Sequence, residues 1–354
     1  MAGTPVSLIR TVGPKLSASA DGRSITLDNG DDLALAIAAL NPSASSPAVI
    51  IMPSGTYTHT SAAIAVPGGL TIKGSGGNVN VTAAFTVTGQ TGVVFEGFTL
   101  SPATVAGTKL PAINFVSGTS TVTIRDMTIT GGTMPAATSV IKHTGGALTL
   151  TFEGTNLVTG VPNGNTAIVS LSGTTAGTYN QSGTLTVGTY NTNKENYTVD
   201  FGPAAGINFT GELVTYGPIS FKGASADNTQ ASFNSVQIHL AGAGAAYAPI
   251  LLVTPVAGLV LHFGTINTTR TAATATACVI CGAVDYGALA DGDPVALGDI
   301  DGGGTSSVVS AGVIVARPVS GAAPYTLSPA GATAGSTNLT TASGCNVPAL
   351  TPVA

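Results

Sequence analysis

The chain has 354 residues, of which 44% are hydrophobic and only 8% charged, so it can bury a large core but has few ionisable groups for chemistry. Its 47 glycines and the lack of a long helical periodicity predict an all-β protein of many short strands with glycine-rich corners. The net charge of -5, with 11 Lys and Arg spread singly, argues against a nucleic-acid partner, because phosphate binding needs clustered cations.

The first 47 residues are expected to form N-terminal strands and one capping helix. Ser24–Leu27 is strand-like, and the helix that follows has three apolar residues on one face: Leu33, Ile37 and Leu40. Asp31 or Asn29 can cap its start, and Asn41-Pro42 ends it. Because the first coil of a wound sheet exposes its core, we expect this helix to lie just before that coil and cover it.

Residues Ala48–Gly74 have the pattern of one complete coil of a β-solenoid. A buried apolar strand, Val49–Met52, is followed by a short β-rich segment, Thr56–Thr60. A second apolar strand, Leu70–Ile72, is entered through Pro67-Gly68-Gly69. Strand, turn and strand within about 25 residues is the unit that a solenoid repeats.

From Leu70 onward one strand recurs at steps of 23 to 29 residues. Its predicted central residues are Ile72, Phe95, Ile124, Phe152, Gln181, Phe209, Phe233 and Leu261. Most of these strands are preceded by a second apolar strand: Ile113–Val116, Val140–Ile141, Ala167–Leu171, Tyr197–Phe201, Ile219–Phe221, Ile250–Val253 and Cys278–Ile280. A period of about 27 residues is too short for a propeller blade and lacks the leucine-rich-repeat pattern, which leaves a parallel β-helix.

The predicted helix followed by VIIMPSGTYT and LTIKGSGG resembles the entry segment of the right-handed parallel β-helix, or pectin-lyase-like, superfamily, and of viral spike, tail and capsid-associated β-helix proteins. The resemblance covers residues 24 to 285 and implies the fold without a catalytic signature. The expected organisation is N-terminal strands and helix over 1–47, a right-handed parallel β-helix over 48–316, and an irregular Pro/Ser/Gly-rich extension over 317–354.

The residue after each central position begins a file of alternating charge: Lys73, Glu96, Arg125 and Glu153. Neighbouring coils would place these side chains side by side, which predicts an exposed ion-pair ladder that sets the register. The alternative is a pectate-lyase-like or glycoside-hydrolase site. In such a site Glu96, Asp126 and Glu153 would hold calcium or act as paired carboxylates, and Arg125 would accept a proton. The absence of Trp argues against a sugar site.

Two further groups of ionisable residues are candidate sites. Asp291, Asp293, Asp299 and Asp301 lie near glycines and could bind calcium, although a solvated loop is the favoured interpretation; no other cofactor is expected. The four His residues are His59, His143, His239 and His262. They do not share a file, so the sequence supports neither a metal triad nor a Ser-His-Asp set.

These patterns predict a structural subunit rather than an enzyme. The expected role is a virion component, such as a capsid-surface, spike or fibre protein, that associates with itself and with other structural proteins. A polysaccharide lyase or hydrolase and a surface adhesin are the alternatives, so polysaccharide is a possible partner. The N-terminus lacks the apolar segment of a secretory signal and no stretch suits a membrane span. The expectation is synthesis in the cytoplasm without a cleaved signal peptide, and location in a virion or extracellular assembly.

Overall fold

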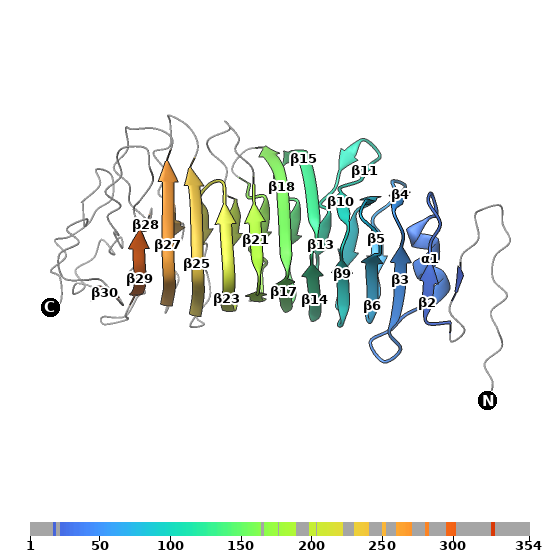
Figure 1. The fold of residues 1–354 in the computed structure, drawn as a ribbon, viewed down its shortest axis with the longest axis horizontal. Helices are drawn as coiled ribbons and strands as arrows, with labels where there is room; N and C mark the ends of the chain where they lie inside the picture. The colour runs from blue at the N-terminus through green and yellow to red at the C-terminus, as the bar shows by residue number, and fades with distance from the viewer. Residues whose placement is uncertain are drawn as a thin grey trace.

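The computed structural model describes residues 17–18, 22–163, 166–175, 177–188, 198–202, 204–221, 230–240, 250–252, 260–270, 280–282, 295–301 and 327–329, with the backbone alone from Leu240 onward. These residues form an elongated parallel β-solenoid with a single short helix (Figure 1). The all-β class and the parallel β-helix predicted from the sequence are therefore confirmed. The strands of successive coils pair in parallel along three faces, which we call faces A, B and C.

Each face is a stack of strands from successive coils. Face A contains β2 (Ser24–Thr26), β3 (Ala48–Met52), β6 (Leu70–Gly74), β9 (Val93–Glu96), β14 (Ser120–Arg125), β17 (Leu148–Glu153) and β20 (Gly177–Gln181). Face B contains β4 (Gly55–Thr58), β7 (Val79–Thr82), β10 (Thr99–Ser101), β15 (Thr128–Ala136), β18 (Thr155–Asn163) and β21 (Thr184–Val187). Faces A and B then share continuous strands, β23 (Ala204–Thr215), β25 (Gln230–Leu240) and β27 (Val260–Arg270).

Face C is a separate sheet of nine strands that closes the solenoid. It contains β5 (Ile64–Val66), β8 (Phe85–Val87), β13 (Ile113–Phe115), β16 (Ile141–His143), β19 (Val169–Leu171), β22 (Val199–Phe201), β24 (Ile219–Phe221), β26 (Ile250–Leu252) and β28 (Ile280–Gly282). Seven of these strands overlap the predicted second apolar strands, so the prediction of a second apolar strand in these coils is confirmed. One antiparallel hairpin, β11 (Thr104–Val105) with β12 (Thr108–Lys109), extends from the coil beside β10.

The predicted central residues of face A form one buried column. Ile72 pairs with Phe95, Phe95 with Ile124, and Ile124 with Phe152, and all four are 0% exposed. The column also extends below the predicted start, because Ile25 pairs with Ile50 and Ile50 with Ile72. In-phase stacking is thus confirmed from the first coil onward.

The last predicted member of the column is wrong by two residues. Phe233 pairs with Phe263, whereas Leu261 pairs with Ala231. Residues two apart along a strand share a face, so apolar alternation alone could not distinguish Leu261 from Phe263. The hydrogen-bonded register selects Phe263 and makes this coil 30 residues long.

Aromatic side chains join the faces into one core. The Phe201 ring from face C lies with its centroid 5.9 Å from that of Phe209 and 5.9 Å from that of Phe233, both on face A. Phe209 and Phe233, on adjacent coils, are 5.2 Å apart at an interplanar angle of 64°. These edge-to-face arrangements are favourable for aromatic pairs and fill the space between the sheets.

The helix α1 (Leu33–Leu40) has the predicted apolar face but a different cap. Asp32, rather than Asp31 or Asn29, is the N-cap, and its side chain accepts a hydrogen bond from the Ala34 N–H. The two expected caps have other partners. Asp31 accepts from the Asp28 N–H at 2.7 Å, and Asn29 accepts from the Thr56 N–H at 2.7 Å. Asn41, in the left-handed conformation with φ 42°, ends the helix as predicted.

The solenoid begins one strand before the helix. β2 precedes α1 in sequence and pairs in parallel with β3, so α1 lies inside the first coil rather than ahead of it. A two-residue strand, β1 (Ser17–Ala18), pairs antiparallel with β2 at the N-terminal end. In the described part of the chain no helix is long and apolar enough to cross a membrane.

Face A continues toward the C-terminus beyond the last coil that was predicted from the sequence. β29 (Val295–Asp301) pairs in parallel with β27, and β30 (Leu327–Pro329) pairs in parallel with β29. β30 lies within the segment that was expected to be irregular throughout. The segment Val308–Val315, whose apolar residues predict one or two further strands, lies outside the described residues.

Candidate functional site: a charge ladder on face A

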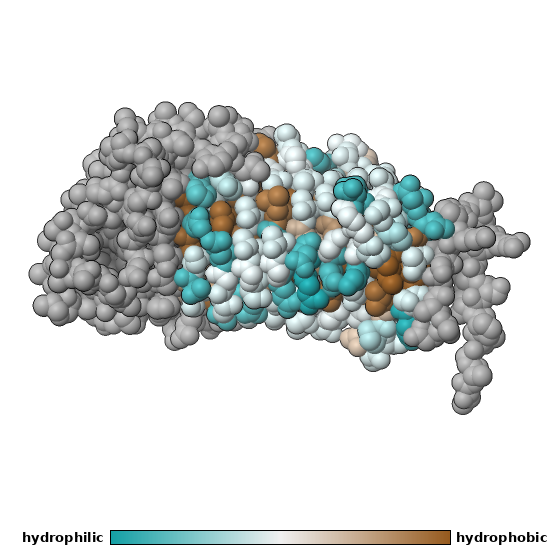
Figure 2. Space-filling view, viewed as in Figure 1, coloured by the Kyte–Doolittle hydropathy of each residue, from teal (hydrophilic) through white to brown (hydrophobic). Residues whose placement is uncertain are grey.

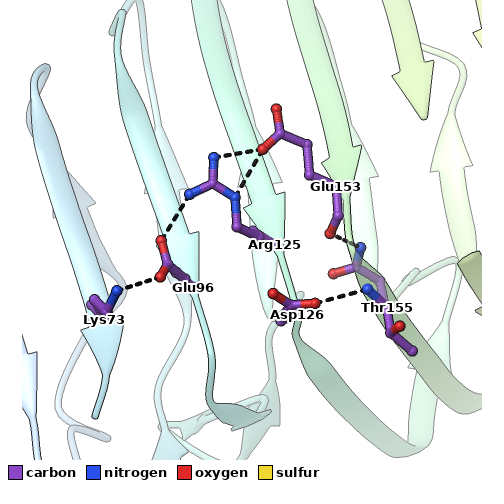
Figure 3. A network of polar contacts seen from close by, with 7 residues as sticks. Lys73, Glu96, Arg125, Asp126, Glu153 and Thr155 are labelled. Atoms are coloured by element: carbon purple, nitrogen blue, oxygen red, sulfur yellow. Dashed lines mark hydrogen bonds and ion pairs between the residues drawn. The ribbon is translucent and has the colours of Figure 1, made fainter. Parts of the chain in front are cut away.

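Four charged side chains point outward from the carboxyl ends of adjacent face A strands. Lys73 in β6 pairs in register with Glu96 in β9, Glu96 with Arg125 in β14, and Arg125 with Glu153 in β17. Each residue directly follows a buried member of the central column, so strand alternation turns its side chain to the outside. Figure 3 shows the four side chains in one row across four strands. We call this row the charge ladder.

Every neighbouring pair in the charge ladder forms an ion pair. The Lys73 Nζ lies 2.6 Å from Glu96 Oε1, and the Arg125 Nη1 lies 3.0 Å from Glu96 Oε2 (Figure 3). Arg125 donates from Nε and Nη2 to Glu153 Oε2 at 2.8 and 2.5 Å. The predicted ladder is therefore present, and its two cations balance its two carboxylates.

The electrostatics of the charge ladder follow from these contacts. Hydrogen bonds and charge from Lys73, and then from Arg125, hold the pKa of Glu96 below its ordinary value. The hydrogen bonds that Arg125 donates to Glu153 and Glu96, and the negative charge of these carboxylates, raise the pKa of Arg125. Because the Arg125 side chain is 41% exposed, solvent screens the pairs and each contributes only about 0 to 1 kcal/mol to stability.

Asp126 lies beside the charge ladder but makes none of its ion pairs. Its backbone has φ 51° at the corner between faces A and B, where the equivalent positions on neighbouring coils are Gly97, Gly154 and Gly183 with φ 71°, 68° and 88°. Its Oδ1 accepts a hydrogen bond from the Thr155 N–H at 2.8 Å (Figure 3). The carboxylate thus fixes the corner of the next coil.

Asn156, which was not predicted from the sequence, supports the same corner from inside. Asn156 is 1% exposed, accepts from the Met127 N–H at 3.0 Å and donates to the Glu153 carbonyl at 2.8 Å. Both groups that it binds belong to the backbone at the turn from face A to face B. Its position outside the apolar column gave no periodic signal, so only the structure reveals this role.

The geometry favours a structural role for the charge ladder over a catalytic one. Both oxygens of Glu96 are occupied by cationic side chains, so calcium would have to displace an ion pair to bind there. The raised pKa of Arg125 keeps its guanidinium protonated and unable to accept a proton. Within the described residues no group of three or more His, Cys, Asp or Glu is placed to hold a metal ion. The lyase or hydrolase alternative stays a prediction for an activity assay.

The acidic segment near the C-terminus is only partly described. Asp299 and Asp301 lie in strand β29, where they pair in register with Thr265 and Asn267 of β27. Asp291 and Asp293 lie outside the described residues. The calcium site predicted for these four residues therefore stays a prediction, with two of its members on a strand rather than in a loop.

His59 and His143 have separate environments, as expected from their unrelated positions in the coils. His143 is 1% exposed, and its Nδ1 lies 2.8 Å from the Tyr179 hydroxyl and its Nε2 2.9 Å from the Gly146 carbonyl. His59 lies within hydrogen-bonding distance of both Asp32 and Ser61, an arrangement that could not be predicted from the sequence. Asp32 comes from the helix cap, outside the coil period, so no repeat pattern could place it beside His59.

The fold alone defines the class of this protein. No family model, no curated protein and no solved structure matches the chain. The described residues define a parallel β-solenoid whose outer surface carries a balanced charge ladder on face A.

Proposed function

We propose that the protein is a structural subunit of a larger assembly, a virion component such as a capsid-surface, spike or fibre protein, that associates with copies of itself and with other structural proteins. The observation that carries this proposal is the outer surface of face B. From β4 to β21 its outward positions contain no charged residue and are mostly threonine. One file across five coils reads Thr58, Thr82, Ser101, Thr130 and Thr159.

Short hydroxyl side chains make face B suitable for close packing against another protein surface. The hydroxyls of Ser101 and Thr130 already bond to each other at 2.9 Å across two coils. Such side chains lose little conformational entropy on burial and carry no charge that must be desolvated. Figure 2 shows a described surface that is largely pale, with hydrophilic and hydrophobic residues in small separate patches. A mostly neutral surface of this kind supports side-by-side association.

Light scattering coupled to size-exclusion chromatography tests self-association. We expect the purified chain to form an oligomer or filament, and we expect Thr99→Lys with Thr128→Lys, both outward on face B, to shift it toward monomer. Thr123→Lys on the outer surface of face A is the matched control and should leave the assembly unchanged. A wild-type chain that stays monomeric at high concentration would contradict the proposal.

The virion setting needs its own experiment. Antibody labelling of purified particles, viewed by electron microscopy, should place the protein at regular positions on their surface. An acidic polysaccharide screen, with and without calcium, separates a scaffold from an enzyme. Turnover that is abolished by Arg125→Ala or Glu153→Gln would favour the polysaccharide lyase or hydrolase and overturn the structural role.

A further inference from the structure

Three side chains near the N-terminal helix form a continuous hydrogen-bonded line. The Ser61 Oγ lies 3.2 Å from His59 Nε2, and the opposite ring nitrogen, Nδ1, lies 3.1 and 3.3 Å from the two carboxylate oxygens of Asp32. Asp32 belongs to the N-cap of α1, whereas His59 and Ser61 follow β4 in the first full coil. The order carboxylate, imidazole, hydroxyl is the one required for a nucleophilic serine.

The proton positions in this line follow from the partners. A carboxylate can only accept hydrogen bonds, so Nδ1 of His59 must donate to Asp32. In a neutral imidazole the other nitrogen, Nε2, is then unprotonated and accepts from the Ser61 hydroxyl. This tautomer places a proton acceptor directly on the serine oxygen.

The acid and the base are held in place before any ligand arrives. Asp32 Oδ1 also accepts from the Ala34 N–H at 2.8 Å, which fixes the carboxylate at the start of the helix. The His59 side chain is 12% exposed, and its backbone N–H donates to the Thr82 carbonyl at 2.8 Å. A purely structural contact between α1 and the coil would need only the Asp32–His59 hydrogen bond. It would not need a hydroxyl group at His59 Nε2.

Donors for a developing negative charge lie next to the serine. Ser61, Ala62 and Ala63 are exposed. The backbone N–H groups of Ala62 and Ala63 have no acceptor among the residues that the structure describes. Backbone N–H groups close to a nucleophile can stabilise the oxyanion of a tetrahedral intermediate. The exposed setting suits a small substrate such as a short-chain carboxylic ester.

We propose that Ser61, His59 and Asp32 form a hydrolytic site for short-chain carboxylic esters, independent of the charge ladder and of assembly. The Ser61 oxygen attacks the ester carbonyl carbon while its proton moves to His59 Nε2. The bond from that carbon to the alcohol oxygen then breaks, and His59 returns the proton to the leaving alcohol. A water molecule, deprotonated by His59 Nε2, then attacks the acyl carbon; the bond from that carbon to the Ser61 oxygen breaks, His59 returns the proton to the Ser61 oxygen, and the carboxylic acid leaves.

Labelling of the full chain with a fluorophosphonate, followed by peptide mass spectrometry, tests the nucleophile. We expect one adduct, on the peptide that contains Ser61, which is lost in Ser61→Ala. The exposed serine Ser45 provides the matched control, and Ser45→Ala should label as the wild type does. The rate of p-nitrophenyl acetate hydrolysis should likewise be lost in Ser61→Ala and unchanged in Ser45→Ala. In His59→Ala, which lacks the base, the rate should fall at least about 100-fold.

Asp32→Asn separates catalysis from folding. Asparagine is as good an N-cap as aspartate, so α1 and the melting temperature should be preserved. The amide lacks the negative charge of the carboxylate that holds the proton on His59 Nδ1. Labelling and ester hydrolysis should therefore fall about as far as they do in His59→Ala. Equal labelling of wild type and Ser61→Ala, or an Asp32→Asn variant with full activity, would overturn the proposal.

Discussion

Gln181 pairs in register with Phe152, so an amide lies in the interior column that carries Ile or Phe on the other coils from β2 to β25. It is 2% exposed, and its polar atoms are used at the next corner. The Nε2 group donates to the carbonyls of Gly183 at 2.7 Å and Glu212 at 3.2 Å, and Oε1 accepts from the Gly211 N–H at 3.1 Å. The amide therefore replaces apolar packing with a link between the backbones of two coils.

Replacing Gln181 by leucine should destabilise the protein although leucine is more hydrophobic. The change leaves buried backbone groups without partners, at a cost of about 2 kcal/mol in the free energy of unfolding. Urea denaturation measures the loss. Asn180→Ala, on the outward neighbour, is the control and should change stability by less than about 0.5 kcal/mol. An unchanged midpoint for Gln181→Leu would show that the corner does not depend on the amide.

The charge ladder should contribute little, and its contribution should depend on salt. A double-mutant cycle with Glu96→Gln and Arg125→Gln should give a coupling free energy of about 0.5 to 1 kcal/mol at low ionic strength. Raising the salt to about 1 M should remove most of it, since the Debye length falls to about 3 Å. A salt-independent coupling of several kcal/mol would contradict the solvent-screened ladder.

Acidification should weaken the fold through His143. Burial lowers the pKa of His143, so at pH values below the ordinary His pKa of about 6.5 the unfolded chain binds a proton that the folded chain does not. Folding stability must then fall as the pH drops below about 6.5, by up to about 1.4 kcal/mol per pH unit from this group.

Urea midpoints measured from pH 7.5 to 5 test the His143 prediction. His143→Gln removes the titrating group but keeps a polar side chain, so its midpoint should depend less steeply on pH than that of the wild type. A urea midpoint that depends more steeply on pH in His143→Gln than in the wild type would contradict the prediction.

Gly154 should tolerate no side chain, whereas Gly77 should accept one. Gly154 has φ 68°, and an added Cβ would lie 2.1 Å from Asp126 Oδ1. Gly154→Ala should therefore cost about 1 to 2 kcal/mol for the left-handed backbone alone. At Gly77 nothing lies within 4 Å of an added Cβ, so Gly77→Ala should be close to neutral. Thermal unfolding of the two variants compares them directly, and equal melting temperatures would contradict the corner geometry.

The sequence predicted those parts of the fold in which a buried apolar residue recurs once per coil. Ile72, Phe95, Ile124 and Phe152 are large, and their order along the chain is the order in which they stack. The charge ladder could be predicted from the same register, because each charge follows a column residue. Most face B strands were missed, since short Thr-rich strands such as β10 carry a single buried apolar residue, Leu100.

The remaining features depend on contacts that no period encodes. Phe263 and Leu261 are two residues apart in one strand, so only backbone pairing shows which of them is the partner of Phe233. Asp32 meets His59 across 27 residues, from a helix that interrupts the first coil. Residues that lie outside the repeat can be assigned to a site only when the coil geometry is known.

The antiparallel pairing of β1 with β2 determines how a copy can approach the N-terminal end of the rod. A parallel coil can extend only along an edge whose strand runs in the same direction, and Ser17–Ala18 runs the opposite way. A second molecule placed on this end would meet a reversed template and could not continue the winding. Growth of a filament by continued parallel winding through this tip is thereby discouraged.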